Sequence, residues 1–277
     1  MSSQRFSLPT LQIPRSITLL ALLLAASLAH AQEKVLASFS GTGNGSRPQC
    51  RLVMDAHGNL YGTTPGGGDV GGGLVFALGP NGHGGWNEKT IYSFDSSANG
   101  TNPNGGLVLD AAGNLYGTTT GGGANGLGTA FELSPTTGGS WTETVIHSFG
   151  ATGDGIFPYA QMIFDAAGNL YGTTAYGGAF GTGEEGGGTV FEISPQTGGG
   201  WTEQVVHSFA SGTDGVQVSG GVALDAAGNL YGATFVGGTH NEGTIYELSP
   251  PTSGAWTETI LHNFAAEPGM DSCPKPE

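Results

Sequence analysis

Basic residues are scarce in this chain of 277 residues, which has 7 Lys and Arg against 22 Asp and Glu. Binding to nucleic acid requires clustered Lys and Arg, so the composition excludes nucleic acid as a partner and disfavours anionic lipid surfaces. After residue 32 no glycine-free stretch is longer than 14 residues. This spacing excludes helical bundles and coiled coils, whose long helices glycine would destabilise.

The chain is rich in glycine and also contains regularly spaced aromatic residues. The 53 glycines and 14 prolines make up about a quarter of the sequence, and 37% of the residues are hydrophobic. Simple disorder would lack residues to bury. The composition therefore predicts an all-β, turn-rich repeat protein.

The N-terminal 31 residues have the pattern of a secretory signal peptide. Arg5 and Arg15 precede an apolar run at 17–29, and Ala29-His30-Ala31 follows as a cleavage signature. The run is shorter than the ~20 residues that span a bilayer, so cleavage is favoured over an uncleaved anchor. We expect a secreted protein without membrane insertion after cleavage, extracellular or alternatively periplasmic or surface-associated. The 5 basic and 22 acidic residues that remain give a net charge of −17.

A repeat of 55 residues organises the remainder of the chain. Asn-Leu-Tyr-Gly occurs four times, and each copy is followed at fixed intervals by an aromatic residue, a tryptophan and a closing phenylalanine; the third copy has five additional residues. The tyrosines are Tyr61, Tyr116, Tyr171 and Tyr231, and the closing residues are Phe94, Phe149, Phe209 and Phe264. Periods of this length are typical of propellers, solenoids or arrays.

The sequence pattern of each repeat predicts four short strands. In the second copy the β-rich segments are 106–110, 115–119, 128–134 and 141–149, separated by Gly, Pro, Asn and Asp clusters. Four antiparallel strands in this length are typical of one propeller blade. The sequence therefore predicts a β-propeller-like ring of four blades, with an open stack of sheets as the alternative.

The repeated motifs resemble those of a known family. The pattern G-L-V-x-D-A-A-G-N-L-Y-G-T-T, then G-T-x-F-E-L-S-P and W-T-E-T-x-x-H-S-F, is similar to the GloVer (Gloeo_Verruco) tandem repeat over residues 35–264. This resemblance implies a propeller-like repeat from a bacterial secreted or surface protein.

The predicted organisation is a signal peptide at 1–31, an outer strand and linker at 32–50, the four-repeat region at 51–264 and a polar tail at 265–277. The repeats span about 51–94, 95–149, 150–209 and 210–264. Phe39 matches the closing phenylalanines, so residues 35–40 copy the end of a fourth strand. In a four-bladed ring this strand and the fourth strand of the last repeat would compete for the same place. Three resolutions remain open: one strand stays peripheral, two chains combine into a larger ring, or the chain is a shortened copy of a longer array.

The two cysteines, Cys50 and Cys273, occupy equivalent linker positions before the first repeat and after the last. A closed ring would bring these linkers together, and an exported disulfide would persist. An intramolecular Cys50–Cys273 disulfide and two unpaired or intermolecular thiols are both open.

Several polar residues are candidates for chemistry. His147, His207 and His262 recur two residues before the closing phenylalanine, where the first repeat has Tyr92. Equivalent positions on separate blades do not converge, so we interpret these histidines as structural and expect no metal site. The Asp-Ala-x-Gly-Asn segments are interpreted as turns in which Asp and Asn bond the backbone, in preference to calcium loops.

The glycine-rich segments 65–73, 121–128 and 177–188 are expected to be loops on one rim of the scaffold, where ligands usually bind. The third contains Glu184 and Glu185, the loop residues that we consider as binding candidates. Adjacent carboxylates on a glycine loop are poorly suited to glycosidase chemistry. No metalloprotease, nucleophile-elbow or C-x-x-C motif is present.

The sequence thus favours a secreted, non-catalytic scaffold without a cofactor, which binds an extracellular glycan or a surface protein through loops. An extracellular propeller enzyme, such as a polysaccharide or antibiotic lyase or hydrolase, is the alternative. That reading would require Asp69, His83, Glu184 and His240 to converge. A shortened fragment of a longer surface array is a third possibility.

Overall fold

The structure is a computed structural model, which describes residues 33–41, 43–95, 98–181, 186–210, 212–218 and 220–265. Residues from Ala37 onward form one compact unit. Of the preceding unit, Met1–Leu36, residues 33–36 are described and have no regular secondary structure. The predicted signal peptide lies outside the described residues, as does 266–277. No helix long and apolar enough to cross a bilayer occurs in the described part of the chain.

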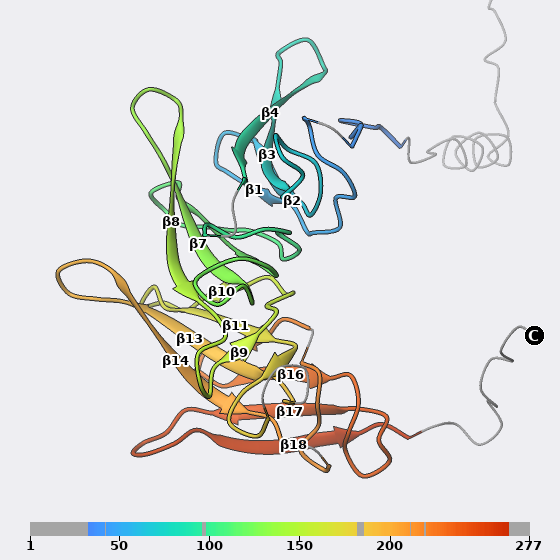
Figure 1. The fold of residues 1–277 in the computed structure, drawn as a ribbon, viewed down its shortest axis with the longest axis vertical. Helices are drawn as coiled ribbons and strands as arrows, with labels where there is room; N and C mark the ends of the chain where they lie inside the picture. Colours follow the sequence, from blue (N-terminus) through green and yellow to red (C-terminus); the bar gives the residue numbers. More distant parts are fainter. Residues whose placement is uncertain are drawn as a thin grey trace, which may run out of the picture. The chain divides into compact units, whose positions relative to one another are not determined.

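All regular secondary structure in the described residues is β-strand (Figure 1). The first sheet contains β1 (Val53–Met54), β2 (Leu60–Thr64), β3 (Leu74–Pro80) and β4 (Trp86–Ser93). The second contains β5 (Val108–Leu109), β6 (Leu115–Thr119), β7 (Thr129–Pro135) and β8 (Trp141–Ser148). The third contains β10 (Ile163–Phe164), β11 (Leu170–Thr174), β13 (Thr189–Pro195) and β14 (Trp201–Ser208). The fourth contains β15 (Ala223–Leu224), β16 (Leu230–Thr234), β17 (Thr244–Ser249) and β18 (Thr257–Asn263).

Each sheet has a meander topology in which strands pair antiparallel with their neighbours in sequence. The third strand carries a bulge next to its central aromatic residue in every sheet, as between Val75 and Phe76. A short ladder of β9 (Gly155–Ile156) and β12 (Tyr176–Gly177) accompanies the third sheet. The predicted all-β architecture of four-stranded antiparallel units is confirmed.

The first hairpin of each sheet is closed by an aspartate. Asp55 Oδ1 accepts the backbone N–H groups of His57 and Asn59 at 2.8 and 2.9 Å. Its Oδ2 accepts Asn59 Nδ2 at 2.8 Å and the Tyr61 hydroxyl at 3.1 Å. The same backbone and amide bonds recur at Asp110, Asp165 and Asp225. The Asp and Asn side chains therefore act within the turn, as local Asx geometry predicts.

The glycine of Asn-Leu-Tyr-Gly is required by close packing. A Cβ at Gly62 would lie 2.6 Å from Phe76 Cζ, and one at Gly117 would lie 2.6 Å from Phe131 Cζ. Gly172 and Gly232 lie against the equivalent aromatic rings in the same way. The aromatic ring of the third strand thus packs against this glycine of the second strand, where no side chain fits.

Neighbouring sheets are joined by aromatic contacts that we call seams. The closing Phe94 packs on Phe131 of the next sheet with ring centroids 5.1 Å apart. Phe149 and Phe209 repeat this contact on the third and fourth sheets at 5.0 and 4.9 Å. The three closing residues are fully buried. In return, the tryptophan of each following sheet contacts the repeat tyrosine of the preceding one.

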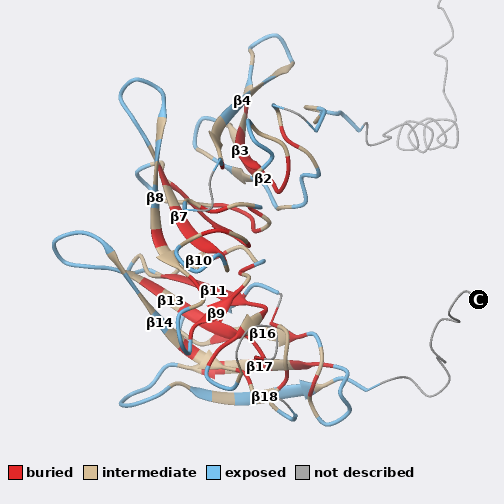
Figure 2. Cartoon of the chain, viewed as in Figure 1, coloured by how far each residue is buried: buried red, intermediate tan, exposed pale blue. Residues whose placement is uncertain are grey.

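Burial follows these seams (Figure 2). Buried residues concentrate along the second and third strands of the sheets, and the hairpin tips after β3, β7 and β13 are exposed. Three hydrophobic clusters join the first sheet to the second, the second to the third and the third to the fourth. Among the described residues no such cluster joins the fourth sheet to the first, so the predicted ring closure is not seen.

The segment before the first sheet covers its outer face. Residues 37–40 form no strand, so the expected outer strand is not made there. Phe39 nevertheless packs on Phe76 at 4.9 Å, the contact that the other closing residues make. Asn44 Nδ2 contacts Glu88 Oε2 at 3.4 Å, and Ser46 bridges to Gly66. Phe39 therefore holds the place that a preceding repeat would occupy.

The closing phenylalanine of the last repeat differs from the others because, in the described part of the chain, no sheet follows it. Phe264 is 44% exposed, whereas Phe149 is fully buried. We expect Phe149→Ala to lower the free energy of unfolding by ~3–5 kcal/mol, as for other buried phenylalanines. Phe264→Ala should cost about 1 kcal/mol or less, because half of its ring is already in water. Denaturant titrations of both variants test this difference, and equal losses would contradict the assignment of the seams.

Candidate functional site

Each seam contains a set of three polar side chains in addition to its aromatic contact. One lies two residues before the closing phenylalanine, one lies five residues after it in the linker, and a glutamate comes from the last strand of the following sheet. The three sets are Tyr92–Asn99–Glu143, His147–Asp154–Glu203 and His207–Asp214–Glu258.

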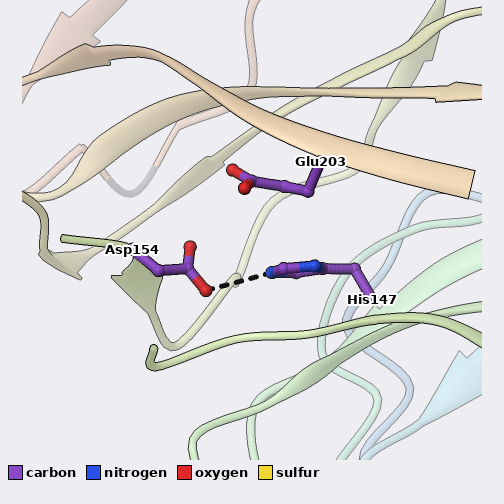
Figure 3. Close-up of side chains that lie close together, drawn as sticks. All are labelled: His147, Asp154 and Glu203. Carbon is purple, nitrogen blue, oxygen red and sulfur yellow. Dashed lines mark hydrogen bonds and ion pairs between the residues drawn. The ribbon is translucent and has the colours of Figure 1, made fainter. Parts of the chain in front are cut away.

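In the second seam, His147 and Asp154 form a close pair (Figure 3). His147 Nε2 lies 3.0 Å from Asp154 Oδ2, and both side chains are largely buried, at 19% and 6% exposed. Asp154 also accepts the backbone N–H groups of Gly150 and Gly155 at 3.0 and 2.6 Å. Glu203 on β14 directs its carboxyl group toward this pair from the neighbouring sheet. One atom of each side chain lies within 4.8 Å of the others.

The third seam repeats this arrangement with looser contacts. His207 Nε2 lies 3.5 Å from Asp214 Oδ1 and 3.9 Å from Glu258 Oε2. These distances exceed those of hydrogen bonds of this kind. Asp214 Oδ2 accepts the Ala210 N–H at 2.5 Å.

The first seam has neutral side chains at two of its three positions. Asn99 Nδ2 donates to the Tyr92 hydroxyl at 3.0 Å. Tyr92 packs edge-on against Phe94 at 5.0 Å, and His147 packs in the same way against Phe149 at 4.6 Å. The imidazole and the phenol ring therefore share a packing role at this position of the repeat.

Burial raises the pKa of the seam glutamates. Desolvation, with a smaller contribution from Asp95, raises the pKa of Glu143 to about 7. Desolvation and then Asp154 raise the pKa of Glu203 to about 7. The pKa of Glu258 is raised too, by desolvation and then by its Asp214 neighbour. Burial also opposes ionisation of Asp214, but His207, Glu258 and the Ala210 N–H outweigh it and lower the Asp214 pKa.

The structure places the predicted histidines in separate locations. His147 and His207 lie in successive seams, and His262 packs on Phe264 in the last sheet at 4.8 Å. Sequence reasoning missed the partners Asp154, Asp214 and the seam glutamates. Their signal was a fixed spacing, five residues after a closing phenylalanine or two after a repeat tryptophan.

Other predicted residues are not brought into a site. Glu184 and Glu185 lie outside the described residues, as does Cys273, so the Cys50–Cys273 disulfide stays a prediction. Cys50 Sγ lies 3.1 Å from the backbone nitrogen of Thr63.

A second group of side chains lines two neighbouring clefts that share Tyr159, here called the Tyr159 clefts. One has a volume of about 240 Å³ and the other about 300 Å³. The first is lined by Arg47, Gln49, Pro65, Asn102, Asn104, Thr120 and Tyr159. The second is lined by Tyr159, Ala175, Tyr176, Gln217 and Phe235.

The Tyr159 clefts combine exposed aromatic rings with amides. Tyr159 is 43% exposed and Phe235 is 70% exposed. Gln217 Nε2 donates to the Tyr176 hydroxyl at 3.0 Å, which fixes both side chains. Arg47, Asn102 and Gln217 have positive φ angles of 56°, 56° and 60°. Non-glycine residues adopt this left-handed conformation rarely, and such strain concentrates at functional sites.

A larger cavity of about 670 Å³ lies beside the second seam. Its walls include residues 150–154 of the linker and 177–181 of the glycine-rich loop that carries the five-residue insertion. Asp154 and Phe180 are among its lining residues, and Phe180 is 65% exposed. The cavity therefore gives solvent a route to the His147–Asp154 pair.

The model of one protein family matches this chain. The Gloeobacter/Verrucomicrobia repeat model aligns with residues 23–184 and again with 90–274. The chain belongs to the Gloeobacter/Verrucomicrobia repeat family. The GloVer resemblance of its motifs is thereby confirmed. None of the curated proteins matches this repeat protein in sequence.

Two solved structures are similar to this Gloeobacter/Verrucomicrobia repeat protein at low identity. The first is a bifunctional GH43-CE protein of Bacteroides eggerthii, with 13% identity and a TM-score of 0.40 over 78% of this chain and 26% of that one. The chain thus spans about a quarter of the length of that protein. The second is the α-L-arabinanase of Cellvibrio cellulosa complexed with arabinohexaose, with 10% identity and a TM-score of 0.40 over 75% of each chain.

The raised pKa of Glu143 predicts a pH-dependent stability difference. Its folded-state pKa of about 7 exceeds the ordinary value of 4.5, so stability is full below pH 4.5 and is lost as the pH rises through about 7. Glu143→Gln removes this loss, because the amide does not ionise. The variant should match the parent at pH 4 and melt at a higher temperature at pH 8.

Thermal melts between pH 4 and pH 8 measure this difference. Glu242→Gln is the matched control, because Glu242 is exposed and should show no such pH-dependent gap. A Glu143→Gln variant that loses stability at pH 8 would contradict the prediction.

Proposed function

We propose that this chain is a secreted, non-catalytic repeat scaffold that binds a neutral extracellular glycan at the Tyr159 clefts. The single observation that carries the proposal is the composition of these clefts. They expose the rings of Tyr159 and Phe235 beside amide, hydroxyl and guanidinium groups. Aromatic faces pack against the C–H faces of sugars, and amides both donate to and accept from sugar hydroxyls.

The variation among repeats supports the same location. The position eight residues after each closing phenylalanine has a positive φ in all four copies, yet it is occupied by Arg47, Asn102, Phe157 and Gln217. The aromatic contacts of the seams, in contrast, are nearly identical between copies. A scaffold with repeated seams and varied cleft residues is suited to recognition of one asymmetric ligand.

Charge favours a neutral glycan. The chain has a formal net charge of −15, with Arg47 as the cationic side chain of the described cleft walls. Long-range repulsion would therefore disfavour strongly anionic polysaccharides.

The clefts also favour binding over hydrolysis. Glycosidases use two carboxyl groups about 5–9 Å apart. Among the described lining residues of the Tyr159 clefts there is no Asp or Glu. Asp69 and His83 belong to loops of the first sheet and His240 to a loop of the fourth. The enzyme alternative therefore has less support than the binding scaffold.

Calorimetric titration with neutral oligosaccharides tests this function. We expect Tyr159→Ala and Phe235→Ala to weaken binding by roughly tenfold each, the order of loss when an aromatic ring that anchors a ligand is truncated. Phe180→Ala is the control, because Phe180 is an exposed phenylalanine outside these clefts.

Three results would overturn the proposal. Release of reducing ends during incubation would show an enzyme. Retention of a surface protein with no retention of glycan would show that the scaffold binds a protein partner. Equal affinities of all three variants for the oligosaccharide would show that it does not bind at the Tyr159 clefts.

We propose further that the four sheets are the blades of a propeller-like array. Closure into a ring would place Phe264 on Phe76, the position that Phe39 occupies. A closed monomer should contain the Cys50–Cys273 disulfide, since both linkers would then meet. Non-reducing mass spectrometry combined with light scattering measures this. A monomer with two reduced thiols would contradict ring closure, and a dimer would indicate a larger shared ring.

A further inference from the structure

The third seam contains three buried polar atoms, one from each of three neighbouring side chains, that have no hydrogen-bond partner among the described residues. These atoms are His207 Nε2, Asp214 Oδ1 and Glu258 Oε1, each shielded from solvent. A buried polar group without a partner destabilises the fold, and more so if it is charged. An ion bound among the three side chains would satisfy all three atoms.

The second seam has the same donors at the same positions. His147, Asp154 and Glu203 come from β8, the following linker and β14, and Glu203 Oε1 is again buried without a partner. In both seams one atom from each of the three side chains lies within 4.8 Å of the other two. Figure 3 shows the three side chains converging from two neighbouring sheets.

We propose that each of these two seams binds one divalent metal ion, with Zn²⁺ as the best match, through one imidazole nitrogen and two carboxylates. Zinc takes His nitrogen and Asp or Glu oxygen at about 2.0–2.2 Å, usually with four ligands. Ligands at that distance from a common centre lie about 3–4 Å apart. The separations of 3.5 and 3.9 Å from His207 Nε2 fall in this range.

The chemistry of the donor set selects the metal. An imidazole in the set disfavours Ca²⁺ and Mg²⁺, which prefer all-oxygen sites. Two carboxylates balance the charge of one divalent ion, which removes the repulsion between Asp214 and Glu258 in a region of low dielectric. A water molecule supplies the fourth ligand, and in the second seam it reaches Asp154 from the 670 Å³ cavity.

Each ion would act as a clamp between sheets. The histidine belongs to the last strand of one sheet, and the glutamate belongs to the last strand of the next. Metal binding to the folded chain alone stabilises it by mass action. This role is independent of glycan binding, because none of the six ligands lines the Tyr159 clefts among their described residues.

The first seam is an internal control. It has Tyr92 and Asn99 in place of histidine and aspartate, with Glu143 as its only carboxylate in the set. An amide and a phenol are poor ligands for zinc, so this seam should bind none. The expected stoichiometry is therefore two ions per chain.

The test is calorimetric titration of chelator-treated full-length protein with Zn²⁺, together with Co²⁺ absorbance. We expect two ions per chain and visible Co²⁺ bands of a low-coordinate nitrogen and oxygen site. The double variant His207→Tyr with Asp214→Asn copies the first seam and should bind one ion. Adding His147→Tyr with Asp154→Asn should abolish binding.

Controls separate these sites from surface histidines and from loss of folding. His262→Tyr should still bind two ions, because His262 lies outside both sets. Glu258→Gln keeps the side-chain shape and should lower the stoichiometry to one, with a melting curve in chelator close to that of the parent. No binding by the parent protein, or two ions retained in the seam-copy variants, would overturn the proposal.

Discussion

The contact on which the structure depends is the closing phenylalanine of one repeat packed on the aromatic residue of the next sheet. A four-stranded antiparallel sheet alone cannot bury both of its faces, so each repeat is stable only beside a neighbour. Phe94, Phe149 and Phe209 bury their rings completely in this contact. The glycine of Asn-Leu-Tyr-Gly exists because the same aromatic ring lies over it. Phe39 extends the contact to the first sheet.

The same contact decides where polar chemistry can occur. Each seam holds the last strand of one sheet against the last strand of the next. It thereby brings together a side chain from the last strand of the preceding sheet, one from the linker and a glutamate from the last strand of the following sheet. In the third seam His207 Nε2, Asp214 Oδ1 and Glu258 Oε1 are buried without a hydrogen-bond partner in the described chain. In the second seam His147 and Asp154 pair with each other at 3.0 Å, and Glu203 Oε1 is the buried atom without a partner. In the first seam Tyr92 and Asn99 pair with each other, and Glu143 Oε1 is likewise buried without a partner. One backbone arrangement therefore holds either a tyrosine–asparagine pair or a histidine–aspartate pair beside the same glutamate.

Recognition and architecture use different positions of the repeat. Seam residues must match the next sheet, so they vary little between copies of the repeat. Three of the four left-handed linker residues, Arg47, Asn102 and Gln217, line the Tyr159 clefts and differ from one another. Separation of the two sets allows the ligand surface to change without loss of the aromatic seams.

The local features of this protein followed from sequence alone. The Asp-Ala-x-Gly-Asn turns and the four short strands depend on residues within a few positions of one another, and the period of 55 residues is visible without a structure. Tertiary structure decided the partners of His147, because Asp154 and Glu203 lie in separate segments that only the seam brings together. It also decided that residues 37–40 pack through Phe39 without forming a strand. Hydrophobic spacing determines which faces are buried, whereas the identity of the opposing face depends on how the sheets pack.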